Sequence, residues 1–287
     1  MLAIDIGGTK LAAALVDGDG QIGRRATRPT PVRADADDLF AALTDAIASV
    51  DPGGTALVVG VGCGGPMSAH GEQVSPLNIP GWRGFPLRSR LAELTGRSVY
   101  VDNDAKALAL GEGWRGAAVG ERNFMAMVVS TGVGGGIVLD GRLLDGASGN
   151  AGHVGHVVVE PYGRVDERHA RGVLEVEASG SAIAEVTGRP AAEAPPEVVE
   201  RTGRLVGRAA ASVCNLLDLS LVVVAGSVAL GFGAPFFAAA QSELDDLCLL
   251  DFSRASRIVP AGLGADGPLV GAAAVGLRGI GADVGVS

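Results

Sequence analysis

The chain has 287 residues and a net charge of −9, with 47% hydrophobic but only 4% aromatic residues. At this length a single hydrophobic core stops growing, so we expect two lobes whose interiors are built mainly from aliphatic side chains. The acidic charge and the lack of a run of five or more basic residues argue against nucleic acid and anionic membranes as partners.

The apolar segments and the cysteines indicate the compartment. No apolar run reaches the length of a membrane span, and the N-terminus lacks a charged region followed by a cleavable apolar stretch. Cys63, Cys214 and Cys248 lie far apart in apolar or mixed segments, which is typical of reduced core thiols. We therefore expect a soluble, cytoplasmic protein.

The first predicted elements form a strand–turn–strand pattern. Alternating apolar residues over 2–6 precede a glycine-rich turn at 7–9, and a second apolar run follows over 11–16. The same order recurs over 124–144, around a turn at 131–136. We interpret the two segments as one supersecondary unit used twice, once per lobe.

The other elements follow from hydrophobic periodicity. Before the second copy, this periodicity predicts helices over 34–50 and 86–94, strands over 55–62 and 98–101, and a helix from about Ala105. After it, the pattern predicts helices over 197–217, 235–247 and 269–277 and strands over 221–225 and 259–261. The segments 145–172 and 187–196 are predicted to be irregular.

The turn after the first strand carries groups that can bind phosphate. Gly7 and Gly8 let the backbone turn tightly, so their N–H groups can contact phosphate oxygens. Thr9 and Lys10 add a hydroxyl and an ammonium group, and the carboxylate of Asp5 can hold Mg²⁺ through water. The alternative is an ordinary glycine-rich hairpin turn. A strand rather than a helix follows, which argues against a Rossmann site.

The corresponding turn of the second copy contains Thr131, Gly132 and Gly134. Its successive N–H donors and its hydroxyl suit the distal phosphates of a nucleotide. Two such turns facing each other across a cleft would clamp one triphosphate.

Asp102, Asn103 and Asp104 follow directly after a predicted strand. A carboxylate at this place, that of Asp104, can accept a proton from a sugar hydroxyl. The alternative role of Asp104 is to cap the N-terminus of the following helix. The residues alone leave both roles open.

Two of the four histidines, His153 and His156, lie close together in a glycine-rich segment. This clustering favours a ligand-facing role or a metal site, and the alternative is a pair of histidines bonded to the backbone of a turn. Asp166, Glu167 and His169 follow in a very polar stretch, most simply a solvated loop.

These segments, taken in order, resemble the repressor, open-reading-frame and kinase (ROK) family of sugar kinases along nearly the whole chain. They are the phosphate motif DIGGTK at 5–10, the sugar-binding segments at 62–66 and 77–82, Asn103-Asp104, the second phosphate motif TGVGGG at 131–136, Gly155-His156, Leu174-Glu175 and the adenosine motif Ala225-Gly226-Ser227. The resemblance implies an α/β, actin-like (ribonuclease H-like) fold of two lobes with the active-site cleft between them. We expect a small lobe over 1–112, a large lobe over 113–268, and a C-terminal helix, about 269–287, packed back onto the small lobe.

The resemblance also implies an ATP-dependent kinase that phosphorylates a hydroxyl, the 6-hydroxyl, of glucose or of a glucose-like or amino hexose. It implies Asp104 as the catalytic base, Mg²⁺ alongside ATP, and a homodimer. The substrate-binding residues that it implies are Gly65, Asn78, Asn103, Asp104, His153, His156 and Glu175. The ATP-binding residues that it implies are Asp5, Gly7, Gly8, Thr9, Lys10, Thr131, Gly132, Gly134, Gly226 and Ser227.

The sequence departs from the family pattern at two places. The family's three zinc-binding cysteines are replaced by Asp166, Arg168 and Val173. His156, Asp166 and His169 supply at most three of the roughly four ligands of a closed zinc site, so we expect no structural zinc. His153 stands where many family kinases have a sugar-binding Glu, which changes the hydrogen-bonding capacity and indicates a preference other than plain glucose.

Two alternatives to the ATP-dependent kinase stay open. A non-catalytic, sugar-sensing regulator of the same family is one, although the sequence starts at the phosphate strand and leaves no room for a helix-turn-helix domain ahead of it. Polyphosphate as the phosphoryl donor is the other, but a basic track for it is missing from the sequence.

Overall fold

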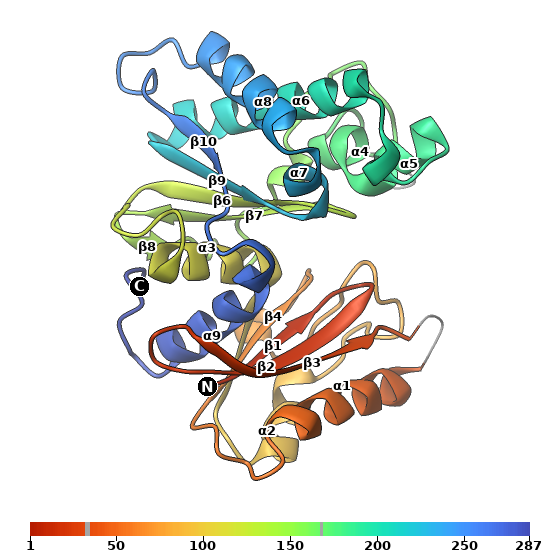
Figure 1. Cartoon of the computed structure of the whole chain (residues 1–287), viewed down its shortest axis with the longest axis vertical. Coiled ribbons are helices and arrows are strands. Elements are labelled where there is room, and N and C mark those ends of the chain that lie inside the picture. The colour runs from red at the N-terminus through yellow and green to blue at the C-terminus, as the bar shows by residue number, and fades with distance from the viewer. Residues whose placement is uncertain (32–34, 167–168) are drawn as a thin grey trace. The chain divides into compact units, whose positions relative to one another are not determined.

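The computed structural model describes residues 1–31, 35–166 and 169–287. These residues form two compact units (Figure 1). Unit 1 comprises 1–119, 143–151 and 262–287, and unit 2 comprises 120–142 and 152–261. The lobe boundaries expected from the sequence are coarser than this division and stay a prediction. Three residues named in the sequence analysis lie outside the described residues. They are Ala34, at the start of the predicted helix over 34–50, and Glu167 and Arg168, in the polar stretch.

Unit 1 is built on a five-stranded sheet in the order β3-β2-β1-β4-β5. Its strands are β1 (Leu2–Ile6), β2 (Lys10–Val16), β3 (Ile22–Pro29), β4 (Val59–Cys63) and β5 (Val99–Asn103). β2 runs antiparallel to β1, as the strand–turn–strand pattern predicts, and also to β3, whereas β4 is parallel to both β1 and β5. The sequence analysis missed β3, because this edge strand is mostly exposed and shows no apolar run.

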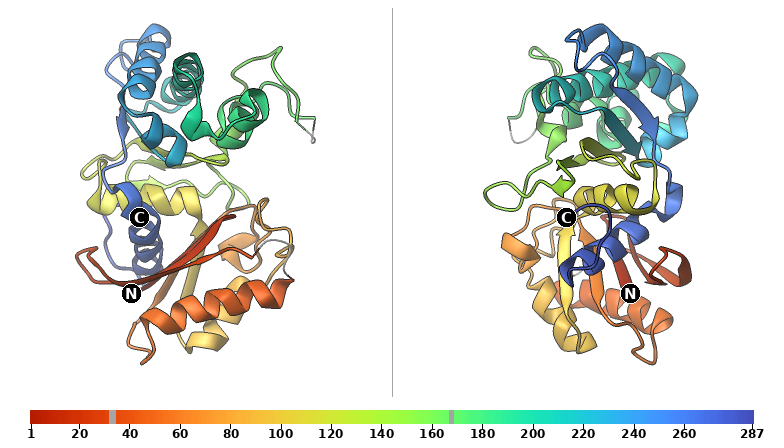
Figure 2. Two further views of the ribbon diagram at one scale, coloured as in Figure 1. Left: turned by 45° about the vertical axis from the view of Figure 1, so that its right-hand side comes forward. Right: turned by 90° about the vertical axis from the view of Figure 1, so that its left-hand side faces the viewer.

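Helices cover both faces of the first sheet (Figures 1 and 2). They are α1 (Ala36–Val50), α2 (Leu87–Thr95), α3 (Asp104–Arg115) and α9 (Gly267–Gly279). α1 and α2 lie on one face, and α3 and α9 lie on the other. α9 approaches β4 so closely that a Cβ atom on Gly60 would lie 1.9 Å from the carbonyl oxygen of Ala272. Glycine at this position therefore permits backbone contact between helix and sheet.

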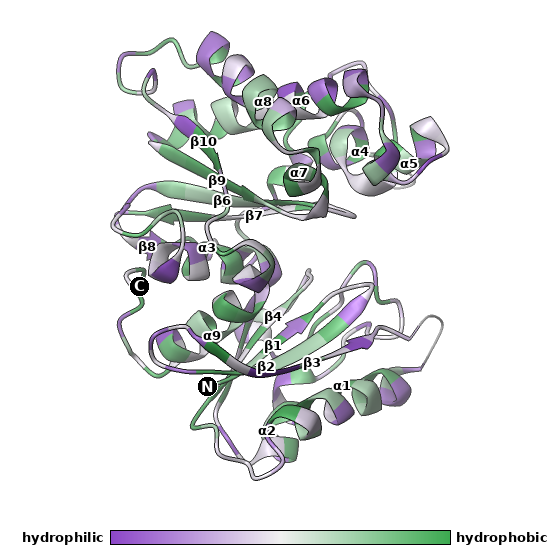
Figure 3. Cartoon of the chain, viewed as in Figure 1, coloured by the Kyte–Doolittle hydropathy of each residue, from purple (hydrophilic) through white to green (hydrophobic). Residues whose placement is uncertain are grey.

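The second sheet has the order β10-β9-β6-β7-β8, which is the topology of the first sheet. Its strands are β6 (Phe124–Val129), β7 (Val133–Leu139), β8 (Arg142–Leu143), β9 (Leu221–Ala225) and β10 (Arg257–Pro260). In both sheets a central first strand pairs antiparallel with the next strand and parallel with a later one. The repeated pattern in the sequence is therefore a repeated supersecondary unit. Hydrophobic residues gather on the central strands of both sheets (Figure 3).

Unit 2 also contains a layer of helices. They are α4 (Leu174–Ala178), α5 (Gly180–Thr187), α6 (Pro196–Leu217), α7 (Ser227–Phe232) and α8 (Ala234–Leu247), with short 3₁₀ turns at Val154–His156 and Ala191–Glu193. α6 and α8 pack at close range, which glycine at positions 203 and 207 permits. Cβ atoms on Gly203 and Gly207 would lie 2.5 and 2.3 Å from carbonyl oxygens of α8. The short helices α4, α5 and α7 were not predicted, since five to eight residues give no clear periodicity.

The expectations about the cysteines and about membrane-spanning segments can be compared with the fold. Cys63, Cys214 and Cys248 are buried and form no disulfide, as expected of core thiols. Within the part of the chain that the structure describes, no helix is long and apolar enough to cross a membrane.

The contact between β4 and α9 predicts a stability effect. Gly60→Ala places a methyl group against the backbone of α9, so we expect a loss of at least about 1–3 kcal/mol in the free energy of unfolding. Gly18→Ala is the matched control, because the corresponding Cβ atom would meet nothing within 4 Å. We expect it to change the free energy by less than about 0.5 kcal/mol. Urea unfolding checks both values, and equal effects would contradict this account of the packing.

Candidate active site

The parallel strands of unit 1 gather several predicted residues at one edge of the sheet. Asp5 on β1 lies in register with Gly62 on β4, which is in register with Asp102 on β5. Asn103 ends β5, and Asp104 begins α3. The carboxyl ends of parallel strands are where α/β sheets bind ligands, so this edge is the first part of the candidate site.

Asp5 and Asp104 are electrostatically coupled within this edge. Burial raises the pKa of the Asp5 carboxyl to about 7, and the Asp104 carboxylate adds to the rise, while Lys10 opposes it. The same two carboxylates, after burial, hold the pKa of the Cys63 thiol well above its usual value. Cys63 is therefore an inert core thiol. A cation close to Asp5 would stabilise the ionised carboxylate and lower its pKa.

Asn103, and not Asp104, is the N-cap of α3, which corrects one of the two roles that the sequence left open. The Asn103 Oδ1 atom accepts a hydrogen bond of 3.0 Å from the Ala105 N–H group. Asp104 lies one residue further on, as the first residue of the helix, and its Oδ1 atom accepts from the same N–H group at 2.9 Å. Asn and Asp are about equally favourable at an N-cap, so residue type alone does not decide between positions 103 and 104.

The start of α3 is held by a buried lysine that the sequence analysis missed. The Lys106 side chain is 2% exposed, and its Nζ atom lies 2.9 Å from Asp102 Oδ1 and 2.7 Å from Asp145 Oδ1. Burial raises the pKa of Asp102, although Lys106 opposes the rise. Asp102 lies on β5 rather than on the helix, and Asp145 lies far along the chain, so the sequence carries no clear signal for these two ion pairs.

The first glycine turn is closed by its own backbone and by a buried threonine. The Gly7 N–H group donates to the Lys10 carbonyl oxygen at 3.0 Å. Thr30 donates from its hydroxyl to the Gly7 carbonyl oxygen at 2.7 Å and from its N–H group to the Thr9 carbonyl oxygen at 3.0 Å. Gly8, Thr9 and Lys10 are exposed. Thr30 was not predicted, because only the pairing of β3 with β2 brings it to the turn.

Asn78 lies beside the same turn. A Cβ atom on Gly8 would lie 2.7 Å from the Asn78 Cβ atom, so only glycine lets the two loops approach. Gly65 belongs to the same loop as Asn78, since the Gly65 carbonyl oxygen accepts a bond of 3.3 Å from the Leu77 N–H group. Unit 1 thus brings Asn78 to the first glycine turn.

The second glycine turn, in unit 2, is fastened by Glu175. The Glu175 Oε2 atom accepts a hydrogen bond of 2.8 Å from the Val133 N–H group, and a Cβ atom on Gly132 would lie 2.8 Å from the same oxygen. Gly134 continues into β7, where it pairs with Val128. The carbonyl oxygen of Thr131 accepts from the N-terminal turn of α5, at 3.3 Å from the Ser181 nitrogen.

Gly226 and Ser227 lie next to the second turn. Gly226 has a φ of 102°, and a Cβ atom there would lie 2.2 Å from the carbonyl oxygen of Val129, at the end of β6. The Ser227 hydroxyl lies 2.9 Å from the Ser130 hydroxyl. Unit 2 therefore brings together the two segments that the sequence analysis assigned to nucleotide binding.

His153 and His156 are placed near Glu175 by a tight glycine contact. Their ring centroids are 6.4 Å apart, both residues are exposed, and the His156 N–H group donates to the His153 carbonyl oxygen at 3.0 Å. A Cβ atom on Gly155 would lie 2.4 Å from the Val133 carbonyl oxygen and 3.3 Å from the Glu175 Cβ atom. The three predicted sugar-binding residues of unit 2 thus lie around the start of β7.

The described residues do not fit a structural zinc site. Among them, no group of three or more His, Cys, Asp or Glu side chains is placed to hold a metal ion. Asp166 Oδ1 instead accepts a bond of 2.8 Å from the Ala170 N–H group, and Val173 offers an aliphatic side chain. The expectation that zinc is not bound stays a prediction, because Glu167 and Arg168 of this loop are not described.

Comparisons with known proteins decide the family. A family model described as the ROK family matches residues 1–278. This chain belongs to the ROK family. Its solved relatives include the ROK family glucokinase from Streptomyces griseus in complex with glucose and AMPPNP, with a TM-score of 0.85 and 28% identity over 97% of this chain and 99% of that one. The fold is accordingly the actin-like fold of the ROK sugar kinases.

The similar ROK proteins include kinases of two kinds of sugar. The glucokinase of Thermotoga maritima is 40% identical over 185 residues, which cover 64% of this chain and 58% of that protein. This chain therefore matches only a little over half of the glucokinase. The N-acetylmannosamine kinase of Citrobacter koseri is 39% identical over 248 residues, which cover 81% of this chain and 84% of that protein.

The raised pKa of Asp5 predicts a pH-dependent loss of stability. Between its ordinary value of 3.8 and about 7, the carboxyl is protonated in the folded chain but ionised in the unfolded chain. The unfolded state then binds fewer protons, so the contribution of Asp5 to stability falls as the pH rises through this range. Asp5→Asn should thus gain stability relative to the parent protein between pH 4 and 8, by up to a few kcal/mol, since each pKa unit is worth about 1.4 kcal/mol.

Urea unfolding in Mg²⁺-free buffer at several pH values measures this difference. Asp19→Asn is the control, because the Asp19 side chain is 88% exposed and should leave the pH dependence of the parent unchanged. Parallel stability curves for the Asp5 variant and the parent would contradict the assigned burial of a carboxylate at this edge.

Proposed function

We propose that this protein is an ATP-dependent sugar kinase that transfers the terminal phosphate of ATP to a hexose hydroxyl, the 6-hydroxyl. Membership of the ROK family and similarity to a glucokinase and an N-acetylmannosamine kinase support the activity. The observation that carries the proposal is the placement of Asn103 and Asp104 at the same sheet edge as Asp5, next to the first glycine turn.

Asp104 is the proposed catalytic base. As the hydroxyl oxygen attacks the terminal phosphorus, the bond from phosphorus to the bridging oxygen breaks, ADP leaves, and the hydroxyl proton passes to the Asp104 carboxylate. Asn103 caps α3 and so holds this carboxylate at the end of β5. The remaining proposed sugar ligands are Gly65, Asn78, Asn103, His153, His156 and Glu175.

Residues of both glycine turns are proposed to take part in ATP binding, as the resemblance to the family implies. In unit 1 the exposed residues Gly8, Thr9 and Lys10 offer N–H, hydroxyl and ammonium groups. In unit 2, Thr131, Gly132 and Gly134 offer the phosphate contacts, and Gly226 with Ser227 contacts the adenosine.

Asp5 fits a role beside Mg²⁺. The residue is 8% exposed and lies shortly before the first glycine turn. Its carboxyl has a pKa of about 7, so a nearby cation would favour the ionised form. When bound, Mg²⁺ would neutralise charge on the triphosphate. Asp5 is the residue proposed to hold Mg²⁺, through water.

The acceptor is proposed to be glucose or a glucose-like or amino hexose. His153 offers one donor and one acceptor, or two donors, where a carboxylate would only accept hydrogen bonds. The names of the similar proteins include both a glucokinase and a kinase of an N-acetylated hexose, so both kinds of acceptor belong in the proposal. By its resemblance to the family we also propose a homodimer that acts in the cytoplasm.

An acceptor screen tests the function. Glucose, mannose, their 2-amino and N-acetylated derivatives, and fructose are incubated with ATP and Mg²⁺, and ADP formation is followed for each. We expect one or two hexoses to give turnover well above ATP hydrolysis without sugar. Sugar binding by calorimetry without turnover for any acceptor would instead indicate a sugar-sensing regulator, and turnover with polyphosphate but not ATP would overturn the proposed donor.

Asp104→Asn tests the proposed base. The amide keeps the size and hydrogen-bonding reach of the side chain but cannot accept the hydroxyl proton, so we expect kcat to fall roughly 10²- to 10⁴-fold. Binding of the preferred hexose, measured by calorimetry, should change by less than about threefold. Asp283→Asn, at an exposed position, should leave kcat unchanged. A near-normal kcat for the Asp104 variant would remove Asp104 from this role.

A further inference from the structure

A buried glutamate lies two residues beyond Glu175 on the helix α4 in unit 2. The Glu177 side chain is 1% exposed. α4 has five residues, which is too few for a helix to be stable by itself in water. The position of α4, and of Glu175 on it, must therefore come from contacts with its surroundings.

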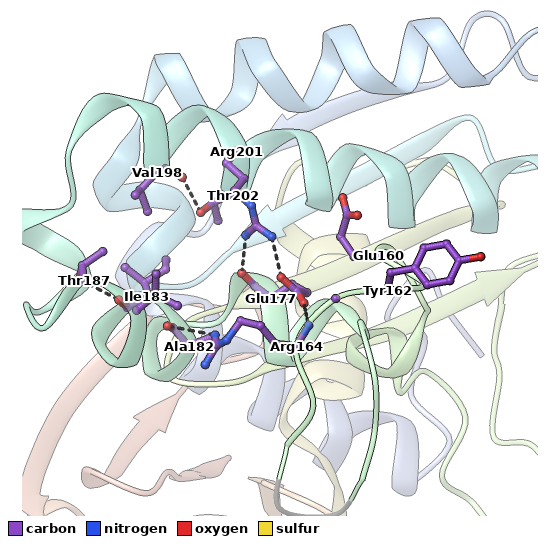
Figure 4. A pocket seen from close by; sticks show the side chains of 12 residues that line it. Glu160, Tyr162, Arg164, Glu177, Ala182, Ile183, Thr187, Val198, Arg201 and Thr202 are labelled. Atoms are coloured by element: carbon purple, nitrogen blue, oxygen red, sulfur yellow. Dashed lines mark hydrogen bonds and ion pairs between the residues drawn. The ribbon is translucent and has the colours of Figure 1, made fainter.

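The Glu177 carboxylate joins α4 to a loop and to α6 (Figure 4). Its Oε2 atom lies 2.6 Å from Arg201 Nη2, and Arg201 Nη1 also donates to the Glu177 carbonyl oxygen at 3.1 Å. Its Oε1 atom accepts a hydrogen bond of 2.6 Å from the Arg164 N–H group. Both carboxylate oxygens thus have a donor, as a buried charge requires.

Arg164 extends the same set of contacts to the helix α5. Its Nη1 atom donates to the carbonyl oxygens of Val176 at 3.0 Å and Ala182 at 3.4 Å, and its side chain pairs with Glu185. Gly163 lets the loop come close, because a Cβ atom there would lie 2.2 Å from Glu177 Oε1. We call Arg164, Glu177 and Arg201 the ionic clasp.

A cavity of about 620 Å³ borders the ionic clasp in unit 2. It is lined on one side by Ile183, Val198 and Thr202, and Arg201 is 47% exposed there. Leu174 and Ala178 of α4 are fully buried, so apolar packing and the polar contacts of the clasp together hold the helix.

Glu175 transmits the position of α4 to the second glycine turn. It accepts the hydrogen bond from Val133, and its Cβ atom lies against Gly155, between His153 and His156. A shift of α4 would move both contacts together. Displacements of about 1 Å in residues that position a substrate can lower rates by about 10²-fold.

We propose that Glu177 is a positioning residue, whose clasp with Arg164 and Arg201 fixes α4 so that Glu175 holds the second glycine turn. The clasp ties the loop residue Arg164 to α4 and α6, and among the described residues it does so without a metal ligand set. The effect on catalysis rests on the proposed function, but the structural effect does not. Both are therefore measured.

The test substitutes Glu177→Gln, which leaves the partly exposed Arg201 to be solvated. Hydrogen exchange at the Val133 amide should accelerate at least about tenfold, because its bond to Glu175 is made less often. With the preferred hexose and ATP, kcat/KM should fall roughly ten- to a hundredfold. Glu243→Gln is the matched control, because Glu243 pairs with Arg208 on the same helix α6 at 2.8 Å, and neither readout should change.

A double substitution separates positioning from general stability. Because Glu177 acts through Glu175, Glu177→Gln should lower kcat/KM by less than about threefold in a Glu175→Gln background. An equal fold loss in both backgrounds would overturn the proposal, as would unchanged Val133 exchange. If Glu177→Gln does not fold, Arg201→Lys serves instead, since it keeps the charge but loses the paired contacts of the guanidinium group. If the parent shows no kinase activity, the proposed function fails, while the exchange measurement still decides the role of Glu177.

Discussion

The arrangement of the candidate site depends on the parallel pairing of β1, β4 and β5. In this register the carboxyl ends of the three strands lie side by side. Asp5 therefore lies beside the start of α3, whose first residue is Asp104. Burial first, and then the Asp104 carboxylate, raise the pKa of Asp5 to about 7, although Lys10 opposes the rise. A bound cation such as Mg²⁺ would favour the ionised form of Asp5.

The two units use one topology but hold their glycine turns in different ways. In unit 1 the turn is fastened by Thr30, which bonds to two carbonyl oxygens. In unit 2 the turn is fastened by the Glu175 carboxylate, which accepts from an N–H group. Gly8 is needed because the Asn78 Cβ atom leaves no space for a side chain, whereas a side chain at position 132 would displace the Glu175 carboxylate from the turn.

Much of the fold was predictable because its signals are local. The strand–turn–strand copies, α1, α6 and β9 lie where apolar periodicity placed them. The cap at Asn103 was not predicted, since Asn and Asp are equally good caps and only the strand end decides between them. Thr30, the contact of Lys106 with Asp145 and the ionic clasp were missed for another reason: the partners lie far apart along the chain, and tertiary packing rather than spacing brings them together. The motifs, in contrast, marked the residues of both glycine turns.

The central claim is that Asp104 faces the reacting hydroxyl of a sugar while the glycine turns bind the phosphates of ATP. A crystal structure of the Asp104→Asn protein with ATP, Mg²⁺ and its preferred hexose tests this claim most directly. We expect one sugar hydroxyl oxygen within roughly 2.6–3.2 Å of the side chain at position 104, with the terminal phosphate in line beyond it. A sugar bound with no hydroxyl near this side chain, or phosphates bound away from the N–H groups of Gly8 and Gly132, would contradict the account.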